Sequence, residues 1–225
     1  MRQIKAVIRY NFMGFYKKPK VILTFLLGFI LCFLLSSRIM PVIQAYKSPV
    51  QMLEPFLWTF GDTTAILLSS VLLLLLFSDL PVLSAITPYY LCRTTKKRWL
   101  FGQLFYVAAV SGIYTVFMLG ATMILCAKVG YPGNIWSNTA AMLAYSKLGE
   151  DLNIPSTVKV MESVTPYGCT AQVILLLFLY ILCLSFIVLA GNLLPGKNRG
   201  LVAGLLFCLY GFLLEPKVLR VLLGF

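Results

Sequence analysis

An apolar stretch from Phe56 to Phe77 limits what this chain can fold into more than any other feature of its sequence. At a rise of ~1.5 Å per residue, about 20 apolar residues cross the roughly 30 Å hydrocarbon core of a bilayer, and this stretch meets that length. A cluster of basic residues follows it along the chain: Arg93, Lys96, Lys97 and Arg98. A long apolar segment beside a basic flank predicts a membrane helix with its cytoplasmic anchor.

The composition of the whole chain agrees with a membrane protein. Its 225 residues are 60% hydrophobic and only 12% charged, whereas soluble domains carry about 25% charged residues. A net charge of +12 would indicate nucleic acid in a soluble chain. Here most basic residues lie just outside apolar runs, where they set orientation and contact phospholipids. We therefore expect membrane lipids as partners and no nucleic acid.

Five apolar segments are long enough, or nearly so, to be spanning helices, and none alternates as barrel strands do. They cover about 21–37, 56–77, 100–127, 171–190 and 201–214. The apolar tail 218–225 is too short to span. The sequence thus predicts an all-α polytopic membrane protein with five transmembrane helices over residues 21–225.

The distribution of basic residues predicts the orientation of these segments. Basic residues precede the first segment, lie between the second and third, and lie between the fourth and fifth, so these three regions share the cytoplasmic side. The N-terminus, residues 1–20, is then cytoplasmic, as is the loop 78–99, and the loop 128–170 is outside. No small-residue cleavage site follows the first segment, so we expect it to remain in the mature protein.

Three regions outside the spans carry helical signals. Residues 1–20 predict an interfacial amphipathic helix, since Ile4, Val7, Ile8 and Phe15 share one face and Arg2, Lys5 and Arg9 the other. In the loop 78–99, Thr87 followed by Pro88 predicts a helix from Pro88 to Trp99. Its basic residues suit docking onto a soluble partner, and lipid headgroups account for them equally well. Residues 137–149 predict a helix in the outer loop.

The sequence offers no chemistry of its own. Histidine is absent and the six cysteines are spread singly, so we expect no metal and no cofactor. No catalytic residues are predicted, because neither a nucleophile–histidine–acid set nor paired carboxylates are present. The run GNLLPGKN, residues 191–198, lacks the Ser or Thr of a nucleotide-binding loop and follows a membrane helix, so it predicts a turn.

Two sets of residues in the apolar segments are candidates for a pathway or an interface. Asp62, near one end of the second segment, either lines a pathway or lies at a wetted helix end as a partner for Arg38. Gly200, Gly204 and Gly211 recur at helical spacing on the fifth segment. Such small residues allow close helix packing, either within the chain or against a second membrane subunit.

The stretch FSDLPVLSAITPYYLCRTTKKRWLFGQLFY, from Phe77 to Tyr106, resembles the region between the second and third spans of bacterial type-2 ABC exporter permeases. By layout the resemblance covers about the first 130 residues. It implies a transmembrane permease domain over 21–225 in a bacterial cytoplasmic membrane, and a coupling helix that sits in a groove of a separate cytosolic ABC ATPase subunit. The coupling residues would be Pro88, Tyr89, Tyr90, Arg93, Lys96, Lys97, Arg98 and Trp99.

That family usually has six spans, whereas five are found here, so the sixth is either missing or atypical. The expected function is a permease, paired with a second copy or a paralogue, that exports a lipid, peptide or hydrophobic compound by alternating access. ATP hydrolysis would occur in the partner, and this chain would not be an enzyme. The alternatives are a substrate-capture subunit of a vitamin importer, with a ligand near Trp58, Tyr131 and Trp136, or a membrane scaffold or immunity protein.

Overall fold

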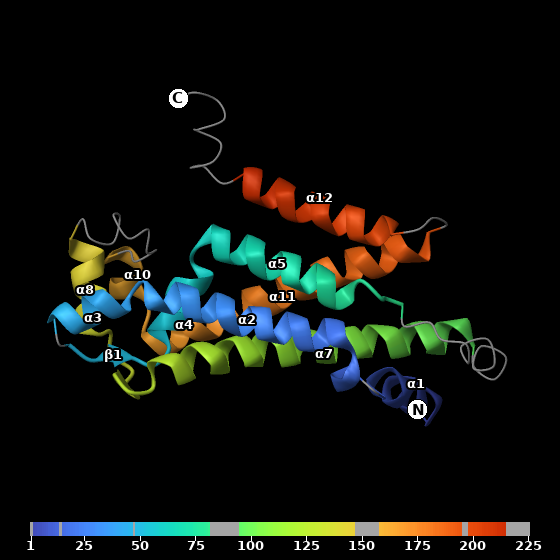
Figure 1. The fold of residues 1–225 in the computed structure, drawn as a ribbon, viewed down its shortest axis with the longest axis horizontal. Coiled ribbons are helices and arrows are strands. Elements are labelled where there is room, and N and C mark those ends of the chain that lie inside the picture. The colour runs from blue at the N-terminus through green and yellow to red at the C-terminus, as the bar shows by residue number, and fades with distance from the viewer. Residues whose placement is uncertain are drawn as a thin grey trace. The chain divides into compact units, whose positions relative to one another are not determined.

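The computed structural model describes residues 2–13, 15–46, 48–81, 95–146, 158–194 and 198–214. These residues are almost entirely helical, apart from one pair of two-residue strands (Figure 1). In chain order the elements are α1 (Arg2–Phe12), η1 (Phe15–Lys17), α2 (Pro19–Ser37), α3 (Met40–Tyr46), β1 (Val50–Gln51), α4 (Glu54–Phe60), α5 (Thr63–Phe77), α7 (Lys96–Cys126), β2 (Gly130–Tyr131), α8 (Asn138–Tyr145), α10 (Val158–Ser163), α11 (Pro166–Leu193) and α12 (Arg199–Leu213).

Three of the described helices are long and apolar enough to cross a membrane: α2, α7 and α11, with 19, 31 and 28 residues. The pair α4 and α5 passes the same test only when the two are taken together, and α12 is shorter, with 15 residues. The chain is therefore a helical, membrane-embedded protein. The sequence predicted five uninterrupted spans, but the second is divided into α4 and α5, and α12, at the place of the fifth, has only 15 residues.

The predicted second span, 56–77, is two helices rather than one, because α4 and α5 are bent by 81° to each other. Helix α4 ends where the N–H of Gly61 donates to the carbonyl of Leu57 at 2.8 Å. A new helix then begins, because the Asp62 carboxylate accepts from the N–H of Thr64 at 3.0 Å and its carbonyl accepts from Ile66. Asp62 is thus the N-cap of α5, which explains the break.

The chain divides into two compact units, each described by itself. Unit 1 comprises Met1–Leu26, Ser70–Tyr114 and Phe178–Phe225. It holds α1, the start of α2, the end of α5, the start of α7, the end of α11, and α12. It therefore contains the regions that the charge pattern assigns to one side of the membrane.

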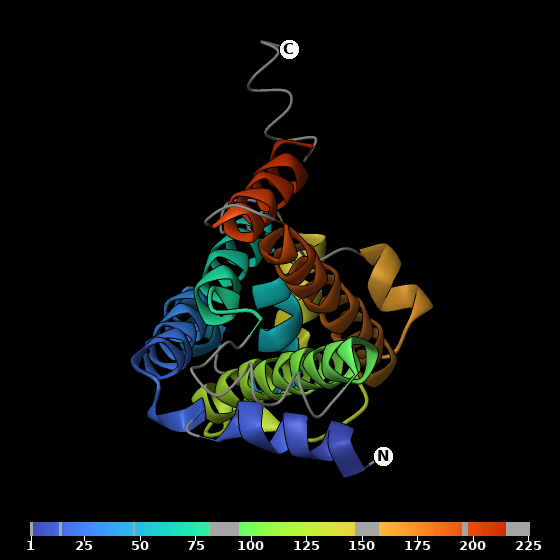
Figure 2. The same cartoon turned by 90° about the vertical axis from the view of Figure 1, so that its right-hand side faces the viewer.

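Within unit 1, α1 runs across the direction of α7 rather than along it (Figures 1 and 2). Its apolar face is buried at Val7, while Lys5 and Arg9 on the opposite face are exposed, as the predicted amphipathic pattern requires. The ring of Phe12 packs edge-on against Tyr106 of α7, with centroids 4.9 Å apart. Helix α1 ends at Phe12, two residues before Gly14, a poor helix former, so it is shorter than the predicted 1–20 segment.

Helix α12 packs closely on α11 and α5 inside unit 1, and glycines make this possible (Figure 1). A Cβ atom added at Gly200 would overlap the carbonyl oxygen of Val188. A Cβ atom at Gly204 would lie 2.5 Å from a methyl carbon of Leu74. At Gly211 an added Cβ atom meets nothing within 4 Å. The first two glycines therefore serve packing within the chain, whereas Gly211 has space around it.

Unit 2 comprises Leu27–Ser69 and Thr115–Leu177. Strands β1 and β2 pair in parallel, with Val50 opposite Gly130. Around them α3, α8 and α10 enclose an apolar cluster that includes Ile43, Trp58 and Leu143. Helix α8 is capped by Ser137, whose hydroxyl accepts from the N–H of Ala140 at 3.0 Å. This helix confirms the one predicted over residues 137–149, with bounds of Asn138–Tyr145 among the described residues.

The glycine geometry makes a testable prediction about stability. Gly200→Ala forces a methyl group against main chain, so we expect a lower unfolding temperature in detergent and a cost of about 1–3 kcal/mol, typical of overpacking. The matched control is Gly211→Ala on the same helix, which should be neutral or stabilising, since alanine favours a helix by up to ~1 kcal/mol over glycine. Equal unfolding temperatures for the two variants would contradict the close packing at Gly200.

Candidate functional site: the base of the basic loop

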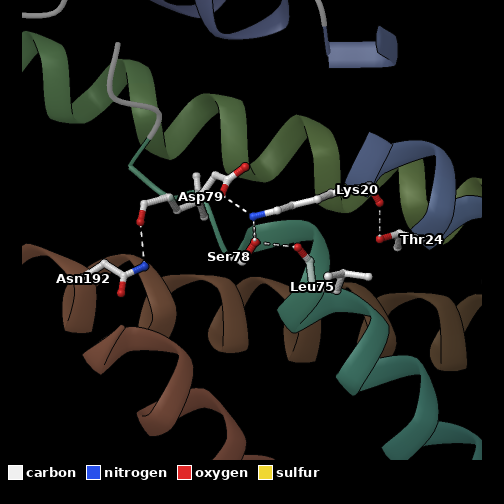
Figure 3. Close-up of polar contacts among 7 residues, drawn as sticks. Lys20, Thr24, Leu75, Ser78, Asp79 and Asn192 are labelled. Atoms are coloured by element: carbon white, nitrogen blue, oxygen red, sulfur yellow. Dashed lines mark hydrogen bonds and ion pairs between the residues drawn. The ribbon is translucent and has the colours of Figure 1, made fainter. Parts of the chain in front are cut away.

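The base of the predicted coupling loop is the short segment after α5, and an ion pair holds it to the start of α2. The Lys20 ammonium group lies 2.6 Å from the Asp79 carboxylate and 3.0 Å from the hydroxyl of Ser78 (Figure 3). The two charged side chains are 45% and 52% exposed. Because it faces solvent, the pair contributes at most about 1 kcal/mol, so it orients the segment more than it stabilises it.

A second tie connects the same segment to α11 and α12 through Asn192. The side-chain amide of Asn192 donates to the carbonyl of Leu80 at 2.6 Å (Figure 3). Its oxygen accepts from the N–H of Gly200 at 3.0 Å. Both main-chain groups lie at helix ends, where no partner exists within the helix. A single side chain therefore joins the end of α5, the end of α11 and the start of α12.

Hydrogen bonds within the helices complete this arrangement. Ser78 donates its hydroxyl to the carbonyl of Leu75 at 2.9 Å, and Thr24 donates to the carbonyl of Lys20 at 2.8 Å (Figure 3). The residues that hold the loop base therefore come from α2, α5, α11 and α12, all inside unit 1.

The predicted coupling residues fall into two groups. Pro88, Tyr89, Tyr90 and Arg93 lie outside the described residues, as does the predicted helix start at Thr87. Lys96, Lys97, Arg98 and Trp99 form the first turn of α7, so they continue into the third membrane helix instead of ending a separate one. The helix runs unbroken from Lys96 to Cys126, so it begins four residues before the apolar segment expected at about 100–127.

The length of α7 sets how far its basic start extends from the membrane. Its 31 residues span ~46 Å, about 15 Å more than the hydrocarbon core. The side chains of Lys96, Lys97 and Arg98 are exposed. Cations at a helix N-terminus oppose the helix dipole, at a cost of up to about 1 kcal/mol each. Helix stability therefore does not account for Lys96 and Lys97.

The structure shows which groups Asp62 contacts. Its carboxylate is 5% exposed, caps α5, and lies 3.5 Å from the guanidinium group of Arg38. Both interactions belong to unit 2. Asp62 is thus a helix cap with a basic partner, the role that competed with a pathway residue in the sequence.

A buried carboxylate that the sequence did not single out lies in unit 2. Glu54 is fully buried at the start of α4, where it accepts from the N–H of Ser137 at 2.8 Å and from the hydroxyl of Ser137. It also accepts from the N–H of Gln51 at 3.3 Å. Glu54 therefore fastens the start of α4 to the cap of α8. A signal for it was present, since Glu followed by Pro is typical of a helix N-terminus.

The aromatic residues proposed to bind a ligand are buried or hydrogen-bonded within the chain. Trp58 is buried, with 5% of its surface exposed. The hydroxyl of Tyr131 donates to the carbonyl of Ile135 at 2.8 Å, and the indole N–H of Trp136 donates to the carbonyl of Val164 at 2.9 Å. Their polar atoms are thus satisfied by the chain itself. Across the described ranges, no three His, Cys, Asp or Glu side chains group as a metal site would require.

No protein-family model, curated protein or solved structure matches this sequence. The residues and their geometry are therefore the basis for the function proposed below.

The two ties at the loop base differ in predicted strength. Asn192→Ala removes two hydrogen bonds of about 0.5–1.5 kcal/mol each and leaves two main-chain groups unpaired, so we expect a loss of about 2 kcal/mol and an unfolding temperature lower by several degrees. Lys20→Gln removes only the exposed pair, with an expected loss under about 1 kcal/mol. Thermal unfolding in detergent measures both. A larger loss for Lys20→Gln would show that the ion pair, not Asn192, is the main tie.

Proposed function

We propose that this chain is the membrane permease subunit of an ATP-driven transporter, similar to the type-2 ABC exporters. In this proposal it lies in a bacterial cytoplasmic membrane with its N-terminus in the cytoplasm, and the bent pair α4–α5 and helix α12 complete five membrane segments. A second copy or a paralogue forms the other half of the pathway. The transporter exports a lipid, peptide or hydrophobic compound by alternating access.

The observation that carries the proposal is the attachment of the loop base. Lys20 with Asp79, and Asn192 with Leu80, tie residues 78–80 to α2, α5 and α11. A loop that served only as a connection would not need contacts to three helices. A loop that receives force from a soluble partner does need them, because the force must reach the membrane helices to move them.

The basic start of α7 supports an anionic partner at the same place. Lys96 and Lys97 extend beyond the hydrocarbon core on a rigid helix, and they oppose the helix dipole. An acidic groove on an ATPase would complement these charges and steer the two proteins together. ATP hydrolysis belongs to that partner, and the permease has no enzymatic role in this proposal.

The described acidic residues support an energy source outside the chain. Asp62 pairs with Arg38, Asp79 pairs with Lys20, and Glu54 accepts hydrogen bonds from Ser137. Ion-driven transporters use intramembrane carboxylates that bind and release the coupling ion. Among the described residues of the membrane segments, each of these carboxylates already has a partner.

The alternatives receive less support from the structure. A capture subunit requires a ligand site, and the polar atoms of Tyr131 and Trp136, which were candidates for it, bond to main-chain carbonyls of the chain. A scaffold or immunity protein gives no reason for a loop base tied to three helices.

The docking claim is tested by charge reversal at the start of α7. Lys96→Glu with Lys97→Glu should abolish co-purification of a cytosolic ABC ATPase with the detergent-solubilised chain, because the substitution places like charges against an acidic groove. Purification from cells that express the natural partner, followed by identification of the ATPase by mass spectrometry, measures the result.

The matched control reverses two exposed lysines of unit 2, Lys128→Glu with Lys159→Glu, which should leave the ATPase bound. Loss of the ATPase in both double variants would indicate a non-specific charge effect. Retention in both would move the contact away from the start of α7, and the absence of an ATPase with the unaltered chain would favour the scaffold.

A further inference from the structure

The turn between β2 and α8 in unit 2, residues 131–136, exposes an apolar side chain although it lies outside the long membrane helices. Ile135 is 74% exposed. No residue from 129 to 146 carries a charge, and helix α8, which follows directly, also exposes Met142 and Tyr145. Soluble domains carry about 25% charged residues, so the composition of this stretch does not match a surface that faces only water.

Side-chain hydrogen bonds hold this turn in place on both sides of Ile135. The side-chain oxygen of Asn134 accepts from the N–H of Tyr167 at 3.1 Å. The indole of Trp136 donates to the main chain just before α11 at 2.9 Å, and the hydroxyl of Tyr131 donates to the carbonyl of Ile135 at 2.8 Å. The fold therefore fixes Ile135 in an exposed position, where in water it would forgo about 1.5–3 kcal/mol of burial energy.

The position of the turn along the membrane helices follows from the same contacts. Helix α7 ends at Cys126, and β2 begins four residues later at Gly130. Tyr167, which the turn contacts through Asn134, is the second residue of α11 and is 44% exposed. Both α7 and α11 are long and apolar enough to cross a membrane. The turn therefore lies where one membrane helix ends and another begins, at the end of α7 opposite its basic start.

The aromatic residues of this region are of the kind that membrane surfaces favour. Phenylalanine is the commonest aromatic residue of the chain, with 16 against 12 tyrosines and three tryptophans. The loop 128–170 nevertheless contains no phenylalanine, and its aromatic residues are Tyr131, Trp136, Tyr145 and Tyr167. Tyrosine and tryptophan are enriched where a membrane meets water, because their rings are apolar and their tips are polar. Interfaces between proteins are enriched in phenylalanine as well, so a lipid surface fits this composition better.

We propose that the turn 131–136 inserts into the lipid leaflet at the end of α7 opposite Lys96. Ile135 reaches the acyl chains, and Tyr167 lies at the level of the headgroups. The hydroxyl of Tyr131 and the indole N–H of Trp136 are already bonded to main-chain carbonyls, so lipid does not leave these two donors unpaired. The insertion does not depend on the ATPase, so it stands apart from the proposed transport function.

The test is the environment of a nitroxide spin label attached at Ile135→Cys, in a chain without its native cysteines that is reconstituted into phosphatidylcholine liposomes. Oxygen concentrates among acyl chains, whereas a neutral nickel chelate stays in water. The ratio of oxygen to nickel collision rates should be several-fold higher at residue 135 than at the reference position Lys159→Cys, which replaces an exposed cation of the same unit. Unfolding temperatures within a few degrees of the unlabelled chain establish that both variants are folded.

Two results would overturn the proposal. Equal collision ratios at residues 135 and 159, with the nickel chelate reaching both labels, would place the turn in water. A label at residue 135 that neither oxygen nor the nickel chelate reaches would show that protein covers the turn, as in contact with a second copy of the chain.

Discussion

The side-chain amide of Asn192 is the constraint on which the arrangement of unit 1 depends. It pairs with the carbonyl of Leu80 and the N–H of Gly200, two main-chain groups that lie at helix ends. Both hydrogen bonds are part-buried, and leaving a buried main-chain group unpaired costs about 1–3 kcal/mol. One side chain that serves both fixes α5, α11 and α12 together. Gly200 is required in turn, because any larger residue would strike the carbonyl of Val188.

In unit 2, polar side chains also pair with main-chain groups at helix ends. Asp62 caps α5 and Glu54 fastens α4 to the cap of α8, so carboxylates rather than an amide satisfy the free ends of helices. A charged group in an apolar setting is unfavourable unless it is paired and hydrogen-bonded. Arg38 and Ser137 provide these partners. In each unit, polar side chains at helix ends fix the positions of apolar helices, because apolar contacts alone are not directional.

The sequence predicted the long apolar helices well, because hydropathy over about 20 residues is a strong signal. Helices α2, α7 and α11 lie where the segments 21–37, 100–127 and 171–190 were expected. It did not predict the break at Gly61 and Asp62, since averaging over 56–77 hides a cap signal of a few residues. The start of α7 at Lys96 was missed for a similar reason. Charged residues were taken to mark the end of a membrane segment, whereas a helix can continue beyond the hydrocarbon core.

The candidate site was predicted only in part. The basic loop was located from its charge, but the residues that hold its base were not, because Lys20, Asp79 and Asn192 are far apart along the chain and no local pattern pairs them. Long-range polar contacts of this kind depend on how the helices pack. Glu54 was missed for the same reason, as its partner Ser137 is 83 residues away.

The most direct test of the account is the side of the membrane on which the start of α7 lies. In a chain without its native cysteines, a single cysteine at Lys97 should react with a membrane-impermeant maleimide only after the cells are permeabilised. A single cysteine at Lys159 should react in intact cells. Labelling of both positions in intact cells, or the reverse pattern, would contradict a cytoplasmic docking loop and with it the proposed function.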